Sequence, residues 1–148
     1  MTLNFNTNKT YIIAEAGVNH NNDLSLAFKM IDLAKKSGAD AIKFQTFKAD
    51  KIQLKNSKKP NYQKKIKHLN YYEIIKSLET NYLDQKKIFE YCKKKNILFL
   101  STPYDEESAD QLEWFYHLTG GETWTDFFAI RPTDYAKAGE DDNWGDIW

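Results

Sequence analysis

Three short runs of almost continuous apolar residues constrain the fold of this chain more than any other feature. They lie at residues 11–17, 41–47 and 97–103, and the first ends at a glycine and the third at a proline. Runs of this length and composition are typical of strands that are covered on both faces. Helix-like stretches separate them, so the order predicts βαβ units and a parallel sheet, which is an α/β fold.

Apolar residues at helical spacing fill most of the sequence between and after these runs. The predicted helices cover residues 24–37, 71–78, 83–95 and 106–118. Asp23 can cap the first helix because its carboxylate can accept free backbone N–H groups of the first turn. Gly38 and Asn96 are residues that favour helix ends. The lysine-rich stretch 48–67 has weak periodicity and predicts a long loop with one helical turn, a kind of loop that is usually functional.

The charge is divided unevenly along the chain. Residues 1–105 contain 19 Lys and 10 acidic residues, whereas residues 106–148 contain 2 basic and 11 acidic residues together with all four tryptophans. This change in composition predicts a junction near residue 112, with one domain at 1–112 and an acidic, Trp-rich segment of unknown origin at 113–148. An ordinary acidic tail on a single domain is the alternative interpretation.

Several classes of protein are disfavoured by what the sequence lacks. No apolar run approaches the roughly 20 residues of a membrane helix. The N-terminal residues show no basic segment followed by an apolar stretch, so we expect a cytoplasmic protein. The single cysteine, Cys92, rules out an internal disulfide framework and is expected to be a core residue of its helix. The lysine-rich loop lacks interleaved aromatic pairs, so we predict no nucleic-acid partner.

Four polar residues lie near the carboxyl ends of the predicted strands, where parallel α/β folds bind their ligands. Glu15 belongs to the first strand, Lys43 and Gln45 to the second, and Thr102 to the third. Lys43 and Gln45 are two positions apart, so they point to the same side. A lysine in an apolar strand is costly to bury without a partner. Two partners remain open, the Glu15 carboxylate in a structural ion pair or the phosphate group of a ligand.

Four blocks of the sequence resemble the N-acylneuraminate synthase family, which includes sialic acid and legionaminic acid synthases. The blocks are IIAEAGVNHN at 12–21, GADAIKFQTF at 38–47, YQKK at 62–65 and EYCKKKNILFLSTPYDEESAD at 90–110, in the same order and spacing as in the family. The similarity covers roughly the first 112 residues. It implies a partial (β/α)8 TIM barrel that consists of the first three to four β/α units.

The resemblance also implies a reaction. In this family the C3 carbon of phosphoenolpyruvate attacks the aldehyde carbon of an open-chain N-acyl-mannosamine-type sugar, water adds at C2, and phosphate leaves with C–O cleavage. A divalent metal, manganese or magnesium, polarises the aldehyde and orients the water. The family is homodimeric, and a chain with open sheet edges is expected to self-associate.

By position, the resemblance assigns roles to individual residues. Lys43 matches a lysine that contacts phosphoenolpyruvate, and Thr102 matches a hydroxyl that binds its phosphate. Glu15 matches a glutamate close to the reacting carbons, where it moves a proton or positions water. Supporting roles fall to residues in the matching motifs, namely Gln45, Asn19 and Ser101. His20, in the first of the four blocks, is expected to be a structural loop residue.

The sequence departs from the family pattern in several places. Asn22 stands where the family has glycine, which is a mild change because asparagine tolerates a left-handed backbone. Asn70 is a further candidate for a polar contact. After Leu112 the family pattern is lost. Residues 127–130 could imitate a fourth strand, but they lack its phosphate-binding lysine, and the later strands with the metal-binding histidines have no counterpart.

These departures leave three interpretations. The first is a fragment of a synthase that condenses phosphoenolpyruvate with an N-acyl amino sugar to a nonulosonic acid and is inactive alone, because a complete barrel needs about 250 residues. The second is a non-catalytic protein that binds a phosphate ligand or another protein. The third is a non-functional product of a truncated gene.

Overall fold

The computed structural model describes residues 10–57 and 69–118. In chain order their elements are β1 (Ile13–Gly17), α1 (Leu24–Lys36), β2 (Ala41–Thr46), α2 (Ala49–Ile52), α3 (Tyr71–Leu78), α4 (Tyr82–Lys95), β3 (Leu98–Pro103) and α5 (Glu106–Leu118). All three predicted strands and all four predicted helices are confirmed, with boundaries that differ by at most two residues. The possible strand at 127–130 lies outside the described residues.

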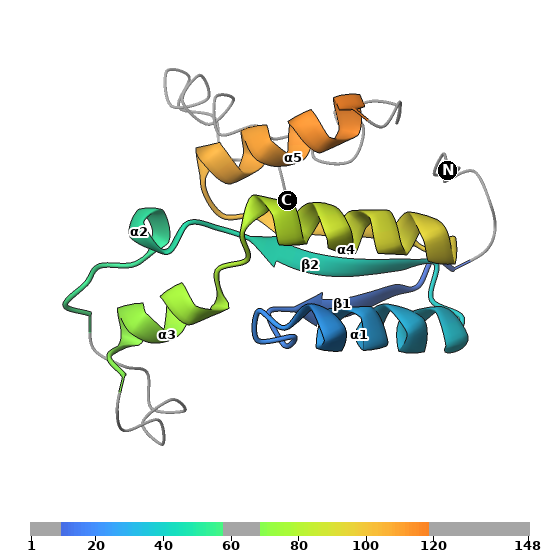
Figure 1. Cartoon of the computed structure of the whole chain (residues 1–148), viewed down its shortest axis with the longest axis horizontal. Helices are drawn as coiled ribbons and strands as arrows, with labels where there is room; N and C mark the ends of the chain where they lie inside the picture. Colours follow the sequence, from blue (N-terminus) through green and yellow to red (C-terminus); the bar gives the residue numbers. More distant parts are fainter. Residues whose placement is uncertain (1–9, 58–68, 119–148) are drawn as a thin grey trace, which may run out of the picture.

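The strands form one parallel sheet in the order β1-β2-β3. The register pairs Glu15 with Lys43 and Gln45 with Thr102. Helices α1 and α4 run alongside the strands, and the arrows of β1 and β2 point to the same end of the molecule (Figure 1). Strand β3 is parallel to β2. The order of elements therefore produces the βαβ arrangement that the apolar runs predict.

One face of the sheet forms the hydrophobic core. Burial alternates along β2, so that Ile42 and Phe44 are almost fully buried while Lys43 between them is only partly buried. Phe44 stacks on Phe99 of β3 with ring centroids 5.8 Å apart. The core residues of the covering helices are Ala27, Ile31 and Ala34 of α1 and Ile88 and Cys92 of α4. The opposite face of β2 carries Lys43 and Gln45, whereas Thr46 is buried on the core face.

Local chain chemistry sets the ends of the helices. Asp23 Oδ1 accepts hydrogen bonds from the backbone nitrogens of Ser25 and Leu26 at 2.8 and 3.2 Å, which confirms the predicted cap. Helix α4 stops at Asn96, whose φ of 53° is the left-handed conformation that asparagine tolerates. Asn22 also has a left-handed backbone, with φ of 59°, so its place in a glycine position of the motif causes no conflict.

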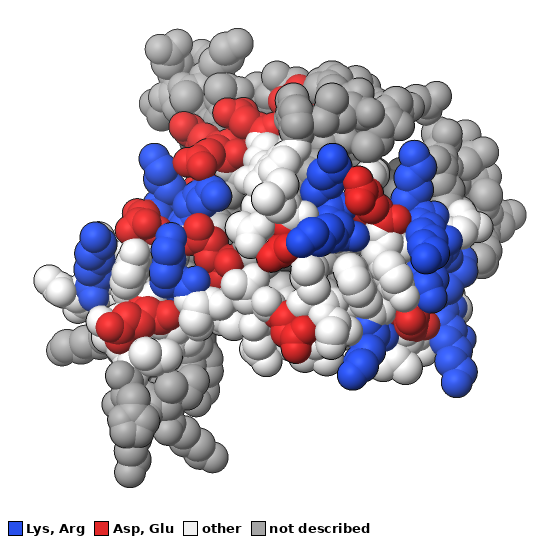
Figure 2. Space-filling model, viewed as in Figure 1, with Lys and Arg blue, Asp and Glu red and all other residues white. Residues whose placement is uncertain are grey.

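Lysines gather at the C-terminal ends of α1 and α4. The last turns of these helices hold Lys35 and Lys36 in α1 and Lys93, Lys94 and Lys95 in α4. Figure 2 shows this concentration of positive charge on the right, where both helices end. Cations are favourable there because the helix dipole leaves partial negative charge at the C-terminus. These lysines lie at the end of the molecule opposite to the carboxyl ends of the strands.

No helix within residues 10–57 and 69–118 has the length and apolar character needed to span a bilayer.

Candidate functional site

Four polar side chains share the sheet face that turns away from α1 and α4. Residues paired across parallel strands point to the same face, so the register brings Glu15 beside Lys43 and Thr102 beside Gln45. Gln45 and Thr102 lie next to the last residue of their strands, whereas Glu15 and Lys43 lie near the middle of theirs. The convergence that the alternation pattern predicts for Glu15, Lys43, Gln45 and Thr102 is therefore present in the fold.

Lys43 and Glu15 form an ion pair. Lys43 Nζ lies 2.9 Å from Glu15 Oε2, and the two side chains keep 35% and 52% of their surface exposed. Of the two partners left open by the sequence, the structure contains the carboxylate. A pair with this much exposure contributes little to stability, about 0–1 kcal/mol. The ammonium group thus remains accessible to an anion that approaches from solvent.

Gly17, the last residue of β1, lies next to the carboxylate and the amide of this site. Its φ is 52°, a conformation that side chains disfavour. A Cβ atom at this position would lie 3.4 Å from Glu15 Oε1 and 3.5 Å from Gln45 Nε2. The register between β1 and β2 also shifts between Glu15 and Gly17, and such irregularities are frequent next to active sites. Both Cβ distances are ordinary van der Waals distances, so the positive φ rather than a lack of space is what favours glycine at this position.

Ser101 lies on the other face of the sheet. It is fully buried, and its hydroxyl lies 2.6 Å from that of Thr46, which also accepts a hydrogen bond from Gln85 Nε2 of α4. Neighbours in a strand point to opposite faces, so Ser101 cannot share the side of Thr102. The Ser101 hydroxyl thus links β3 to β2, and Thr46 links both to a helix. The supporting role expected for Ser101 stays a prediction.

The loop after β1 contains Asn19 and His20, which occupy different environments. Asn19 is exposed, and its backbone nitrogen donates to Ala16 O at 3.1 Å. His20 is buried against the edge of the Phe44 ring, with centroids 5.7 Å apart. Asn19 therefore remains a candidate for contact with a ligand. The structural role expected for His20 agrees with its burial against Phe44.

We expect His20 to make stability depend on pH. Burial lowers its pKa below the ordinary value of 6.5, and the nearby Asp23 carboxylate offsets part of this effect. Below pH 6.5 the unfolded chain binds a proton that the folded chain resists, so the free energy of unfolding falls as the pH drops toward the lowered pKa. Urea unfolding at pH 7.5 and 5.5 measures this. The His20→Phe variant keeps the aromatic contact and should lose less stability, whereas equal losses would contradict the prediction.

Asn70 and Cys92 have structural roles. The Asn70 side chain accepts a hydrogen bond from Glu73 N at 2.9 Å, and Glu73 returns one to Asn70 N, so this residue caps α3. Cys92 is buried in the core, and burial raises the pKa of its thiol to about 12. A thiol that stays protonated at neutral pH is a poor nucleophile. Cys92 is thus a core residue, as predicted.

The described residues do not form a metal centre. Within residues 10–57 and 69–118, no group of three or more His, Cys, Asp or Glu side chains lies close enough to hold an ion. Glu15 is the carboxylate of the candidate site, and it is engaged with Lys43. These residues alone do not fit the divalent metal that the resemblance implies, so the manganese or magnesium requirement stays a prediction.

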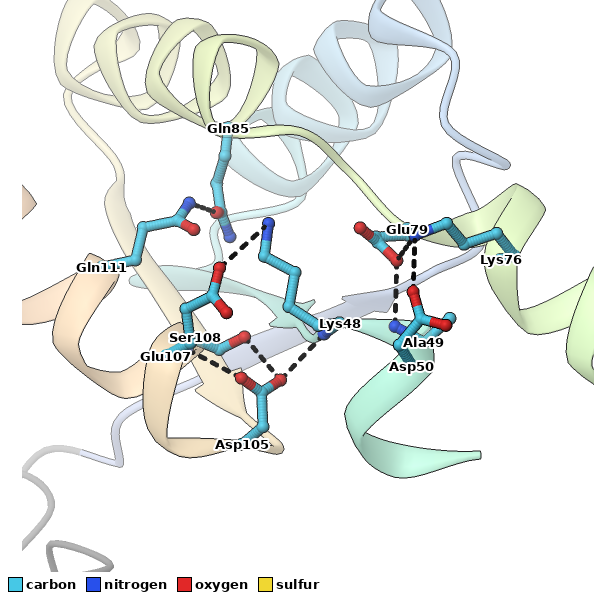
Figure 3. Close-up of polar contacts among 10 residues, drawn as sticks. All are labelled: Lys48, Ala49, Asp50, Lys76, Glu79, Gln85, Asp105, Glu107, Ser108 and Gln111. Carbon is cyan, nitrogen blue, oxygen red and sulfur yellow. Dashed lines mark hydrogen bonds and ion pairs between the residues drawn. The ribbon is translucent and has the colours of Figure 1, made fainter. Parts of the chain in front are cut away.

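Sequence reasoning did not identify two carboxylates at the carboxyl end of the sheet. Asp105 accepts a hydrogen bond from Lys48 N, and Glu79 accepts one from Ala49 N (Figure 3). The sequence does contain a signal for Asp105, because an aspartate directly before the predicted helix at 106–118 can be expected to cap that helix. The sequence contains no such signal for Glu79, since this residue lies between two predicted helices and its partner, Ala49, is distant in the sequence.

Known proteins resemble this chain over most of its described residues. The sequence model of the NeuB family matches residues 30–118. The N,N'-diacetyllegionaminic acid synthase of Campylobacter jejuni is 48% identical over 106 residues, which cover 70% of this chain and 32% of the relative. The enzyme of the same name from Legionella pneumophila is 48% identical and covers 69% and 29%. The chain therefore spans about a third of the length of these curated relatives.

A solved structure supports the same relationship. The N-acetylneuraminic acid synthetase of Leptospira borgpetersenii aligns with a TM-score of 0.57 and 32% identity, over 78% of this chain and 38% of the other. The three parallel β/α units correspond to part of the TIM barrel of such synthases. The family match covers more than half of the chain and includes β2, β3 and the residues Lys43, Gln45 and Thr102. This chain belongs to the NeuB family.

Proposed function

We propose that this chain forms the phosphoenolpyruvate-binding part of a nonulosonic acid synthase. The observation that supports the proposal most directly is the half-exposed Lys43–Glu15 ion pair at 2.9 Å, beside Gln45 and on the same sheet face as Thr102. A cation, an amide, a hydroxyl and a carboxylate in one place suit a small, highly charged phosphorylated acid.

In this proposal the donors bind the anionic groups of phosphoenolpyruvate. The Lys43 ammonium supplies a charge-assisted hydrogen bond to the ligand, and the Thr102 hydroxyl donates to a phosphate oxygen. The Gln45 amide and Asn19 in the loop after β1 have supporting roles. When the ligand binds, Lys43 exchanges part of its contact with Glu15 for a contact with the ligand, which leaves the Glu15 carboxylate free to act.

Glu15 would serve the chemical steps. A carbon–carbon bond forms between C3 of phosphoenolpyruvate and the aldehyde carbon of the sugar, and the aldehyde oxygen takes up a proton. Water then adds at C2, and phosphate departs with the bridging oxygen, which leaves a ketone at C2. The Glu15 carboxylate is suited to accept a proton from this water or to position it. A divalent metal would polarise the aldehyde when it is bound by other parts of the enzyme.

The wider properties of the enzyme are part of the same proposal. The second substrate is an N-acyl amino sugar, the assembly is a homodimer and the site of action is the cytoplasm. A polypeptide of these 148 residues is shorter than the roughly 250 residues of a complete barrel. We therefore propose that this polypeptide by itself binds phosphoenolpyruvate without turnover, which is also what a non-catalytic phosphate-binding protein would do.

Calorimetry with the 148-residue chain tests this proposal. We expect phosphoenolpyruvate to bind, and pyruvate, which lacks the phosphate, to bind at least about tenfold more weakly because charge-assisted hydrogen bonds are lost. A phosphate-release assay with N-acetylmannosamine and manganese should show no turnover. Equal affinity for both ligands would refute the phosphate subsite, and turnover would refute the proposed dependence on additional strands.

A further inference from the structure

The turn between β2 and α2 leaves two neighbouring backbone amides without partners in its own helix. They belong to Lys48 and Ala49, which are the N-cap and the first residue of α2. The first amides of a helix have no intrahelical acceptor, and the Lys48 side chain provides no cap. This turn comes after the carboxyl end of β2, the strand that contains Lys43 and Gln45 of the proposed subsite.

Carboxylates from two distant parts of the chain accept these amides. Lys48 N donates to Asp105 Oδ2 at 2.8 Å, and Ala49 N donates to Glu79 Oε2 at 2.9 Å. Figure 3 shows the two carboxylates approaching the turn from different elements. Asp105 lies between β3 and α5, and Glu79 lies between α3 and α4. Two consecutive peptide units are thus held by two separate segments.

Each carboxylate is itself fixed by a second set of bonds. Asp105 accepts from the backbone nitrogen of Ser108 at 2.9 Å and from its hydroxyl at 2.7 Å. Glu79 Oε2 lies 2.8 Å from Lys76 Nζ, and only 14% of the Glu79 side chain is exposed. Hydrogen bonds to charged acceptors are stronger than neutral ones, particularly where water is partly excluded. The turn is therefore held to two acceptors that have little freedom to move.

This arrangement sets the spacing between the carboxyl ends of β2 and β3. Asp105 follows Thr102 by three residues, and Tyr104 N donates to Thr46 O at 3.0 Å, which continues the pairing past Thr102. A change in the turn at Lys48 would shift the end of β2 relative to the end of β3. The bonds described here for Glu79 and Asp105 go to the turn and to their own helices, so an effect of these residues on a ligand would be indirect.

We propose that Glu79 and Asp105 are positioning residues of the phosphoenolpyruvate subsite. By binding the amides of Lys48 and Ala49, they hold the ends of β2 and β3 at the spacing that lets Lys43 and Thr102 contact one ligand. This inference rests on the proposed function, because it concerns the affinity of that same subsite.

The test compares variants of the full chain by calorimetry with phosphoenolpyruvate and by amide hydrogen exchange. We expect Glu79→Ala to speed exchange at Ala49, and Asp105→Ala at Lys48, and each to raise the dissociation constant about tenfold. Glu79→Gln keeps an acceptor oxygen and should restore affinity to within about threefold. Glu107→Ala is the matched control, because this exposed carboxylate lies 3.8 Å from Lys48 Nζ and does not bind the amides.

The outcomes separate this inference from the proposed function. If the wild-type chain does not bind phosphoenolpyruvate, the proposed function fails and this inference falls with it. If the wild type binds and the alanine variants exchange faster yet keep its affinity, the two carboxylates are merely structural and the inference alone is overturned. Unchanged exchange overturns it as well. If an alanine variant does not fold, Asp105→Asn decides, with an expected rise of roughly threefold in the dissociation constant.

Discussion

Replacing Lys43 with alanine is expected to raise the dissociation constant for phosphoenolpyruvate by about a hundredfold. The ammonium group supplies a charge-assisted hydrogen bond to an anionic ligand, and such bonds contribute about 1.5–3 kcal/mol. Every 1.4 kcal/mol corresponds to a factor of about ten in affinity. The variant also leaves the Glu15 carboxylate at the site without its 2.9 Å partner, which adds repulsion toward the ligand.

This effect should be separable from any effect on folding. The Lys43–Glu15 pair is 35% and 52% exposed, so its loss should change the free energy of unfolding by no more than about 1 kcal/mol. Calorimetry and urea unfolding of the same samples measure both quantities. Lys36→Ala, in the last turn of α1, removes an exposed lysine far from the proposed subsite and should leave affinity unchanged. A Lys43→Ala variant that binds as tightly as wild type would disprove the role of this lysine.

Replacing Phe44 with alanine should have the largest effect on stability. Phe44 is 2% exposed and contacts the His20 ring at 5.7 Å and the Phe99 ring at 5.8 Å between centroids. Truncation of a buried phenylalanine removes apolar burial and leaves a cavity, at a cost of about 3–5 kcal/mol. That cost is a large part of the stability of a small domain, so we expect a strongly lowered urea midpoint.

Leu33→Ala is the matched control for this prediction. Leu33 lies on α1 with 62% of its surface exposed, so its truncation should change the free energy of unfolding by about 0.5 kcal/mol or less. Similar losses in the two variants would mean that the core does not lie on the α1 and α4 face of the sheet. Circular dichroism at increasing urea concentration provides the comparison.

Most of the fold could be predicted because its signals are local. The apolar runs mark the strands, and residues such as Asp23 and Asn96 act on backbone groups within one helical turn. The sequence gives less indication of what stabilises α2, since the side chain at its N-cap, Lys48, does not cap it. The carboxylates that accept hydrogen bonds from its first amides belong to other segments, so the local sequence does not predict them.

The candidate site was predicted in part. Alternation along β2 correctly places Lys43 and Gln45 on one face, and the ends of the neighbouring predicted strands add Glu15 and Thr102. The same alternation places Ser101 on the opposite face from Thr102, because the two residues are neighbours in β3. Ser101 was included in the predicted site because it belongs to the matching motif. The two-residue period of a strand places its hydroxyl on the core face, where it forms a hydrogen bond with Thr46.

The sequence alone determined the type and order of the elements and the family to which they belong, because periodicity, capping and motif spacing are properties of neighbours along the chain. The tertiary structure decided which groups meet. Glu79 and Ala49 are 30 residues apart, and Asp105 and Lys48 are 57 residues apart, yet each pair is joined by a hydrogen bond. Such contacts depend on strand register and on how loops pack at the end of the sheet, and these are fixed only when the whole arrangement forms.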